Sequence, residues 1–446
     1  MNWYRDPIRL AEEVARHGSV NAAARENDTA ETTVRRWTQR HRITLPHPNT
    51  PKSTTSAPPE QAEPSELAAM RRRLERALAD SRALKAENRE LARGANLLDD
   101  VRDLLSPVVD GLVLPKPRTV RPSKPRKQPV SLVLHLCDLH WGEIVDPDLV
   151  SGDNAYSPEI AARRLQHGVD TTLLWIDNYT QLAGVDEVVV VVNGDTVSGQ
   201  HIIHPDSADE YARIAKQVLD AGLVVAQAIR DIASNVRRVR VIGTQGNHPR
   251  STRRMPTGRA RSETSWETLL HEFVAALLIR AENVEFHIAR GYKTHVRIGP
   301  SIWAFAHGDA MKGGGGNLGI PAYALKRTHD ATRDRSVTRA RSSDTLGIDD
   351  IVKHTRVGHF HLYTKWQVGE GDIAIAPSPK GVDPFVTDLL EKYSPAGFLL
   401  EAVHPEHDVI GDHVISVQHI MDASGPCRYS WGALEDGTPA AALMAR

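Results

Sequence analysis

Five short motifs of metal-ligand residues, each at or near the end of a strand-like run, constrain this chain more than any other feature. They read Asp138-Leu139-His140, Gly194-Asp195, Gly246-Asn247-His248, Ala306-His307-Gly308 and Gly358-His359-Phe360-His361. Four of them follow apolar runs, at 132–136, 188–192, 239–242 and 302–306. Because a strand end is a rigid support for a ligand, this order predicts side chains aimed at one shared point.

The chemistry of the motifs favours a catalytic metal centre. They supply two carboxylates, one amide and five imidazoles, and no thiolate. Oxygen and imidazole ligands suit Mn, Fe or Zn rather than a structural zinc. We therefore expect a site for two divalent metal ions, with manganese favoured and iron or zinc as alternatives. His307 could instead be an ordinary core histidine, and His135, one residue out of register, is expected to face a neighbouring strand.

Length and composition limit the class of protein. At 446 residues the chain is too long for one ordinary core, so two or three units are expected. Two cysteines, Cys137 and Cys427, do not make a disulfide framework. The sequence has no 18-residue apolar run and no signal-peptide pattern at its N-terminus. These features predict a soluble, cytoplasmic protein without a membrane partner.

Charge is unevenly distributed along the chain. Residues 1–130 hold 24 Lys and Arg against 17 Asp and Glu, a net charge of +7. Because the whole chain has a net charge of −1, residues 131–446 carry a net charge of −8. A basic front and an acidic body suit a polyanion-binding front end and a cation site behind it. The alternative is chance asymmetry.

Residues 1–45 read as three short helices, at 7–17, 20–26 and from about 29 to 42. This unit resembles a helix-turn-helix DNA-binding domain whose third helix is the recognition helix. Val34 and Trp37 of this helix are expected to face inward. Arg and Gln side chains could reach base edges, and Thr hydroxyls could meet phosphate. A small protein-binding module with a solvated basic face is the alternative. The DNA-contact candidates are Thr32, Thr33, Arg35, Arg36, Gln39 and Arg40.

Two linkers and a heptad helix separate this unit from the rest. Residues 46–64 contain six prolines and form a linker. From 65 to 105 the heptad pattern predicts a coiled-coil helix and, because of the polar Asn88, a parallel homodimer. A single amphipathic helix lying on the body is the alternative. Residues 106–130 form a second, basic and Pro-rich linker. The heptad positions are Leu67, Leu74, Ser81 and Asn88 at a, and Met70, Ala77, Leu84 and Leu91 at d.

The catalytic body is expected at 131–425, followed by a tail at 426–446. Helix-like stretches at 157–178, 206–234 and 262–281 alternate with strands in the first half. Later strands, at 285–288, 302–306, 363–368, 373–376, 397–403 and 413–419, lack long helices between them. This pattern predicts an α/β domain with a βαβ first half and a more antiparallel second half.

The ordered motifs resemble the signature of the calcineurin-like metallophosphoesterase superfamily over residues 131–380. The resemblance implies an α/β/β/α sandwich with two metals at the sheet ends. It assigns Asp138, His140 and His361 to the first metal and Asn247, His307 and His359 to the second, with Asp195 bridging both. His248 resembles the catalytic histidine, which would protonate the leaving oxygen or stabilise phosphoryl charge.

The chain departs from this pattern at two positions. The family commonly has Asp or Glu after Asn-His, where this chain has Pro249, and often Asp or Asn three residues after the bridging aspartate, where it has Ser198. Neither change removes a ligand, but both leave open how His248 is held and how close the chain lies to the repair nucleases of the family.

Two basic stretches could meet a phosphate substrate. Arg250, Arg253 and Arg254, with Arg259 and Arg261 behind them, follow the candidate catalytic histidine directly. A basic insertion after His307, with its glycine run at 313–316, could be a mobile lid or a nucleic-acid clamp. The alternatives are a solvated loop and a disordered insertion. The basic residues of the insertion are Lys312, Lys326, Arg327, Arg333, Arg335, Arg339 and Arg341.

These features together predict a metal-dependent phosphoric ester hydrolase, with nucleic acid favoured as a phosphodiester substrate and partner. One alternative is a phosphomonoesterase or protein phosphatase whose front end recruits a partner. A second is a non-enzymatic DNA-binding assembly protein, against which the intact ligand set argues.

Overall fold

The computed structural model describes residues 6–17, 20–27, 30–40, 65–117, 128–200, 213–311, 320–343, 346–389 and 393–432. The chain divides into two compact units, residues 1–79 and 80–446. The boundary lies inside one long helix, α4 (Ser65–Leu112). No helix in the described part of the chain is long and apolar enough to span a membrane.

The N-terminal helices lie where the sequence places them: α1 (Pro7–His17), α2 (Val20–Glu26) and α3 (Glu31–Arg40). Asp6 accepts hydrogen bonds from the first backbone N–H groups of α1, and Pro7 occupies its first turn. Val34 is buried with Leu10 of α1, which leaves Thr32, Arg35, Arg36 and Gln39 exposed on the opposite face of α3. The predicted linker at 46–64 lies outside the described residues.

The first sheet of the body has the order β11-β10-β1-β2-β3-β4. Strands β1 to β4 are parallel, and β10 and β11 join them antiparallel at one side. Parallel strands buried on both faces are expected to be almost wholly apolar, as the Val188–Val192 run is. The strands are β1 (Val130–Leu136), β2 (Val185–Asn193), β3 (Arg238–Thr244), β4 (Val284–Ile288), β10 (Gly397–His404) and β11 (Asp408–Ser416).

Helices α5 (Pro158–Leu182), α6 (Ile214–Ala233) and α8 (Trp266–Leu277) cover the outer face of this sheet. Alternation along the strands explains how both faces are buried: Leu132 and Leu134 pack with the helices, whereas Val133 packs against the second sheet. A short helix, α7 (Ala260–Glu263), precedes α8, and single turns lie at Pro147–Val150, Ile348–Asp350 and Phe385–Leu389.

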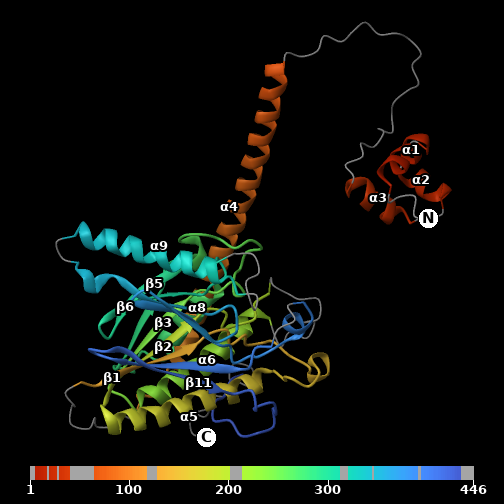
Figure 1. Ribbon diagram of the computed structural model, residues 1–446. Coiled ribbons are helices and arrows are strands. Elements are labelled where there is room, and N and C mark those ends of the chain that lie inside the picture. The colour runs from red at the N-terminus through yellow and green to blue at the C-terminus, as the bar shows by residue number, and fades with distance from the viewer. Residues whose placement is uncertain are drawn as a thin grey trace. The chain divides into compact units, whose positions relative to one another are not determined.

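The second sheet has the order β5-β6-β7-β9-β8 and faces the first. Helix α9 (Ala322–Arg341) packs on its outer face, so that α5 and α6 lie on one side of the strands and α9 on the other (Figure 1). This is the α/β/β/α sandwich that the family resemblance implies. The strands are β5 (Lys293–Ile298), β6 (Ser301–Ala306), β7 (Val352–Val357), β8 (Thr364–Val368) and β9 (Gly371–Ile375).

Three elements are missing from the sequence prediction. Strand β5 is half-exposed, and β7 reads Val-Lys-His-Thr-Arg-Val, which lacks an apolar run. Its Arg356 is nevertheless fully buried between the sheets, where Glu401 and Asp372 pair with the guanidinium. Helix α9 forms within the stretch predicted as a mobile insertion, because one of its faces packs on the second sheet; residues 312–319 lie outside the described residues.

Two predicted domain boundaries also shift, and the strand predicted at 413–419 lies earlier, at Asp408–Ser416. Helix α4 continues past residue 105 to Leu112, through the start of the predicted second linker, because Leu98 and Leu112 are buried against the body. Residues 426–432, predicted as part of a tail, pack on the body as well. Tyr429 is buried there and Arg428 pairs with Asp231.

Candidate metal centre

All five motifs meet at one edge of the sandwich. Strands β1, β2 and β3 are parallel in the first sheet, and β6 and β7 are parallel in the second. Each motif follows the carboxyl end of one of these strands, so the fold brings loops that are far apart in sequence to the same place.

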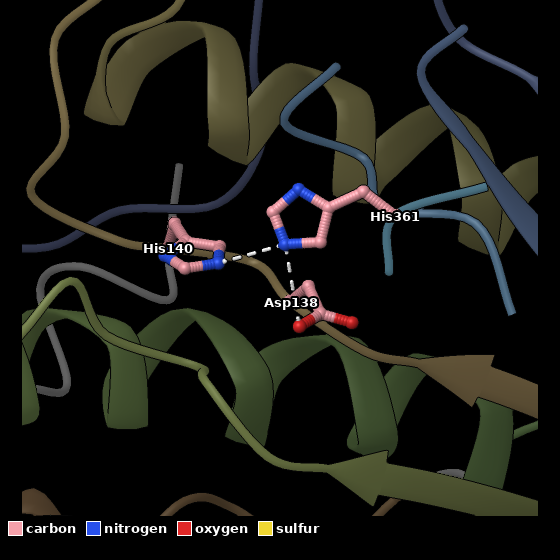
Figure 2. Close-up of side chains that lie close together, drawn as sticks. All are labelled: Asp138, His140 and His361. Carbon is pink, nitrogen blue, oxygen red and sulfur yellow. Dashed lines mark hydrogen bonds and ion pairs between the residues drawn. The ribbon is translucent and has the colours of Figure 1, made fainter. Parts of the chain in front are cut away.

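Asp138, His140 and His361 form the first group of donors. Figure 2 shows dashed lines from the His361 ring to both His140 and Asp138. The Nε2 atoms of His140 and His361 lie 3.1 Å apart, and His361 Nε2 lies 3.4 Å from Asp138 Oδ1. Asp138 and His140 are almost completely buried. One donor atom from each residue lies within 4.8 Å of the others, a separation that a single bound cation could bridge.

Asp195, His307 and His359 form the second group, and Asn247 adjoins it. His307 Nε2 lies 2.9 Å from Asp195 Oδ2 and 3.1 Å from Asn247 Oδ1. It also lies 3.9 Å from Asp138 Oδ1 of the first group. Because Asp195 offers a second oxygen toward the neighbouring loop, it lies where a carboxylate could bridge two ions.

The glycines before Asp195, Asn247 and His359 are required by close packing at the centre. A Cβ on Gly246 would lie 1.9 Å from Asp195 Oδ1, and one on Gly358 would lie 2.4 Å from Asp138 Oδ2. A Cβ on Gly194 would lie 2.4 Å from His307 Nδ1. The candidate ligands therefore lie so close together that only glycine fits before Asp195, Asn247 and His359.

The ligand backbones are strained. Seven described residues other than glycine have positive φ, and five of them belong to the motifs. Such conformations are costly for residues with a side chain and persist where the surrounding structure imposes them. The five are Asp138, His140, Asp195, His359 and His361.

Asn193, at the end of β2, links the two sheets beneath the centre. Its side chain donates to the carbonyl of Ala306 at 3.0 Å and accepts from the Thr244 hydroxyl at 2.6 Å. Its own carbonyl lies 2.9 Å from Nδ1 of His307. A carbonyl only accepts, so this bond places the proton on Nδ1 and turns Nε2 toward the metal position.

Glu267 of α8, which the sequence analysis did not identify, joins two ligand loops from behind. Its carboxylate accepts hydrogen bonds from the backbone N–H groups of Asp195 at 3.1 Å, Thr196 at 2.9 Å and Gly246 at 2.8 Å. The Thr196 hydroxyl adds a fourth at 2.6 Å. Burial and the nearby Asp195 raise the pKa of Glu267 to about 7. The sequence contains no local signal for it, since it lies on a helix rather than at a strand end.

We expect Glu267→Gln to weaken metal binding and turnover by roughly 10-fold to 100-fold, the usual effect of losing a group that orients metal ligands. Glutamine has one acceptor oxygen, so its NH₂ group would face backbone N–H donors. Titration of the purified variant with Mn²⁺ measures the effect, with Glu263→Gln, an exposed residue of the adjacent α7, as the matched control. Unchanged Mn²⁺ affinity in Glu267→Gln would show that the carboxylate does not support the centre.

The structure shows how His248 is held without an acidic residue at position 249. Its Nδ1 lies 2.9 Å from the Ser198 carbonyl, and its backbone N–H donates to Asp195 Oδ1 at 2.8 Å. The Ser198 hydroxyl in turn donates to the His140 carbonyl at 3.1 Å. The main chain at Ser198 therefore orients the ring and leaves Nε2 available. A donor atom of His248 also lies within 4.8 Å of those of His140 and Asp195.

The ionisation of the site matches a cation-binding role. Burial raises the pKa of Asp195, but His307 and His248 outweigh it and hold the pKa well below the usual range. Burial lowers the pKa of His307, but Asp195 raises it to about 10. Burial holds the pKa of His140 well below its ordinary value. Neutral imidazole and ionised carboxylate are the forms that bind metals, so a cation would displace the His307 proton.

The arginines after His248 have different roles. Arg250 is half-buried, and its guanidinium donates to the carbonyls of Thr252 at 3.0 Å and Asn247 at 2.6 Å. It therefore stabilises its own loop. Arg261 is buried and pairs with Asp309, so it is not a free phosphate ligand as the sequence suggested. Arg253 and Arg254 are exposed on the same loop.

The other sequence candidates divide in the same way. His135 lies between the sheets and contacts Glu401 at 2.9 Å, as expected for a residue outside the ligand set. Thr33 is half-buried on α3, and the side chain of Arg40 lies outside the described residues. Lys380, not singled out in the sequence, is a buried cation paired with Glu143 at 2.7 Å close to His140.

The sandwich with its candidate ligands at one edge has the arrangement that the resemblance to calcineurin-like metallophosphoesterases implies. No protein-family model matches the sequence, and neither does any curated protein. Among solved structures, the chain is similar to a dimetal phosphatase from Danio rerio, with 12% identity and a TM-score of 0.33, over 65% of this chain and 99% of that one.

Two further solved structures are similar at the same level. A novel archaeal phosphodiesterase shares 10% identity at a TM-score of 0.29, over 64% of this chain and 99% of that one. Vps29 from Entamoeba histolytica in complex with Zn²⁺ shares 11% at a TM-score of 0.25, with the same two coverages. Identities and TM-scores this low carry no information about the activity of this chain.

Proposed function

We propose that the chain is a dinuclear metal-dependent phosphodiesterase acting on nucleic acid. The observation that carries this proposal is the pair of donor groups, Asp138–His140–His361 and Asp195–His307–His359, meeting at one sheet edge with His248 beside them. The donor set contains only oxygen and imidazole nitrogen, which fits Mn²⁺, Fe or Zn²⁺. Two bound cations would neutralise phosphate oxygens and supply hydroxide near neutral pH.

The chain's own residues would position the substrate and handle a proton. The Ser198 carbonyl holds the Nδ1–H of His248, so its Nε2 is the ring atom free to meet the leaving oxygen or a phosphoryl oxygen. Arg253 and Arg254, exposed on the loop that follows, would contact phosphates flanking the scissile one.

A pair of small chromogenic esters tests the reaction type. With Mn²⁺ added, we expect bis-p-nitrophenyl phosphate to be hydrolysed with a higher kcat/KM than p-nitrophenyl phosphate. The reverse preference would favour the phosphomonoesterase or protein phosphatase alternative. Absence of both activities, with metal bound, would favour the non-enzymatic DNA-binding alternative.

The N-terminal half supports nucleic acid as the substrate. The face of α3 opposite Val34 exposes Arg35, Arg36 and Gln39, which suits contact with DNA. In α4, the d position Leu84 is 60% exposed in the single chain. An exposed leucine on a heptad seam is consistent with a parallel coiled-coil dimer that pairs two such DNA-binding units.

We expect an N-terminal fragment that includes the heptads to be a DNA-binding dimer. The sequence suggests a fragment of residues 1–105, but Gly94 and Leu98 are buried against the body. A fragment of residues 1–93 leaves out these two residues and so does not expose the surface that packs on the body. Two linked units gain affinity through effective concentration. Sedimentation and DNA-binding titrations in varied salt measure both properties.

The matched variant carries Arg35→Ala and Arg36→Ala. It should bind more weakly and with a smaller salt dependence, since each lost phosphate contact on duplex DNA removes about 0.9 from the slope of log K against log salt. In the full chain, hydrolysis of the small diester should be unchanged. A monomeric fragment that does not bind DNA at low salt would make the front end a protein-binding module.

A further inference from the structure

The placement of α9 connects its first turns to the metal centre. His329 Nδ1 lies 2.8 Å from the Thr355 hydroxyl, and the Ser336 hydroxyl accepts from the backbone N–H of Val352 at 3.1 Å. The helix therefore runs antiparallel to β7. Its N-terminal end lies at the carboxyl end of β7, where Leu325 packs in one cluster with Val357. That is the strand end from which His359 and His361 follow.

Exposed side chains, three of them cationic, follow one another along α9. Tyr323, Arg327, Arg335 and Arg339 are exposed, Tyr323 by 79%. They are separated by four, eight and four residues, so at 3.6 residues per turn the row winds by about 160° around the helix from Tyr323 to Arg339. At 1.5 Å per residue the row extends about 24 Å from the ligand edge.

The charge of this row is not compensated within the described chain. The helix holds six Lys and Arg against two Asp, a net charge of +4, on a body whose net charge is −8. No carboxylate of a described residue lies within ion-pair distance of Arg327, Arg335 or Arg339. The repulsion is evident below the helix, where burial and Arg335 lower the pKa of Lys293.

We propose that this row, Tyr323, Arg327, Arg335 and Arg339, binds the sugar-phosphate backbone of a single nucleic-acid strand that extends from the metal centre. The proposal rests on the proposed function and names its substrate as a polymer. Exposed guanidinium groups eight and four residues apart suit phosphates along one strand, and an exposed aromatic ring at the site end suits stacking of a base. A small phosphomonoester at the centre could not reach a row of this length.

The test compares three sets of full-length chains, all carrying Arg35→Ala and Arg36→Ala to reduce binding by the N-terminal unit. One has no further change, one adds Arg327→Gln, Arg335→Gln and Arg339→Gln, and the control adds three other substitutions. Glutamine keeps the helix propensity of arginine, so α9 should fold. The control substitutions, at the opposite end of the first sheet, are Arg237→Gln, Arg238→Gln and Arg280→Gln.

Binding is measured without metal, by fluorescence anisotropy of a labelled single-stranded oligonucleotide over a range of salt concentrations. We expect the α9 variant to bind at least roughly tenfold more weakly at low salt and its log–log salt slope to fall by roughly 2, about 0.7 for each lost contact. In the control, the changes in affinity and in salt slope should be less than half of those in the α9 variant.

Hydrolysis separates this inference from the proposed function. With Mn²⁺, the α9 variant should lose kcat/KM on the oligonucleotide but hydrolyse bis-p-nitrophenyl phosphate at the unsubstituted rate. Absence of hydrolysis by every chain would contradict the proposed function, while the binding measurement would still report on α9. Equal oligonucleotide binding by the α9 variant and the control would overturn the inference.

Discussion

Asp195→Asn is expected to reduce hydrolysis of bis-p-nitrophenyl phosphate by about 10³-fold or more, because bound metal supplies several kcal/mol of transition-state stabilisation. Asp195 contacts His307 at 2.9 Å through one oxygen and the His248 backbone through the other. An amide of the same shape keeps these positions but removes the negative charge between the two donor groups. The metal content of the purified variant should therefore fall below two equivalents per chain.

Elemental analysis and the rate assay together measure this result. Asp186→Asn is the matched control, since Asp186 lies on the same strand, β2, at the end far from the centre. Circular dichroism should show both variants folded, because the asparagine is isosteric. Two retained metal equivalents with an unchanged rate would remove Asp195 from the centre.

His248→Ala is expected to keep both metal equivalents and reduce turnover by ~10²–10⁴, the usual range for a group that transfers a proton. Its ring is oriented by the Ser198 carbonyl, but a donor atom of the ring lies within 4.8 Å of those of His140 and Asp195. The geometry is therefore compatible with a ligand as well, and the metal content of the variant decides between the two roles.

The leaving group supplies a second measurement. If His248 donates a proton to the leaving oxygen, its loss should slow a phenyl ester more than a p-nitrophenyl ester, since p-nitrophenolate departs without a proton. His407→Ala, an exposed histidine on the body, is the control. Loss of metal in His248→Ala, or an equal loss on both esters, would contradict the role of proton donor.

The sequence was sufficient to predict an element where neighbouring residues alone indicate whether that element is buried or exposed. Apolar runs such as Val188–Val192 predict buried strands, and the structure shows them buried. The same patterns place the helices at 7–17 and 20–26 correctly, since Asp6, Pro7 and the apolar spacing are all local.

The sequence was insufficient where the environment is made by distant residues. Strand β7 was missed because its Arg356 is buried only through the charges of Glu401 and Asp372, which lie in other strands. The hydrophobic face of α9 was hidden for a similar reason: the second sheet, not the helix's own composition, makes burial of Leu325 favourable.

The candidate site shows the same division. The sequence by itself determined which side chains could be ligands, because oxygen and imidazole donors at strand ends can be recognised one motif at a time. Only the tertiary structure decided which of them meet and what holds them: Asn193 between the sheets, Glu267 behind two loops and the Ser198 carbonyl on His248. Those contacts are hydrogen bonds between segments remote in sequence, and their partners are chosen when the sheets pack.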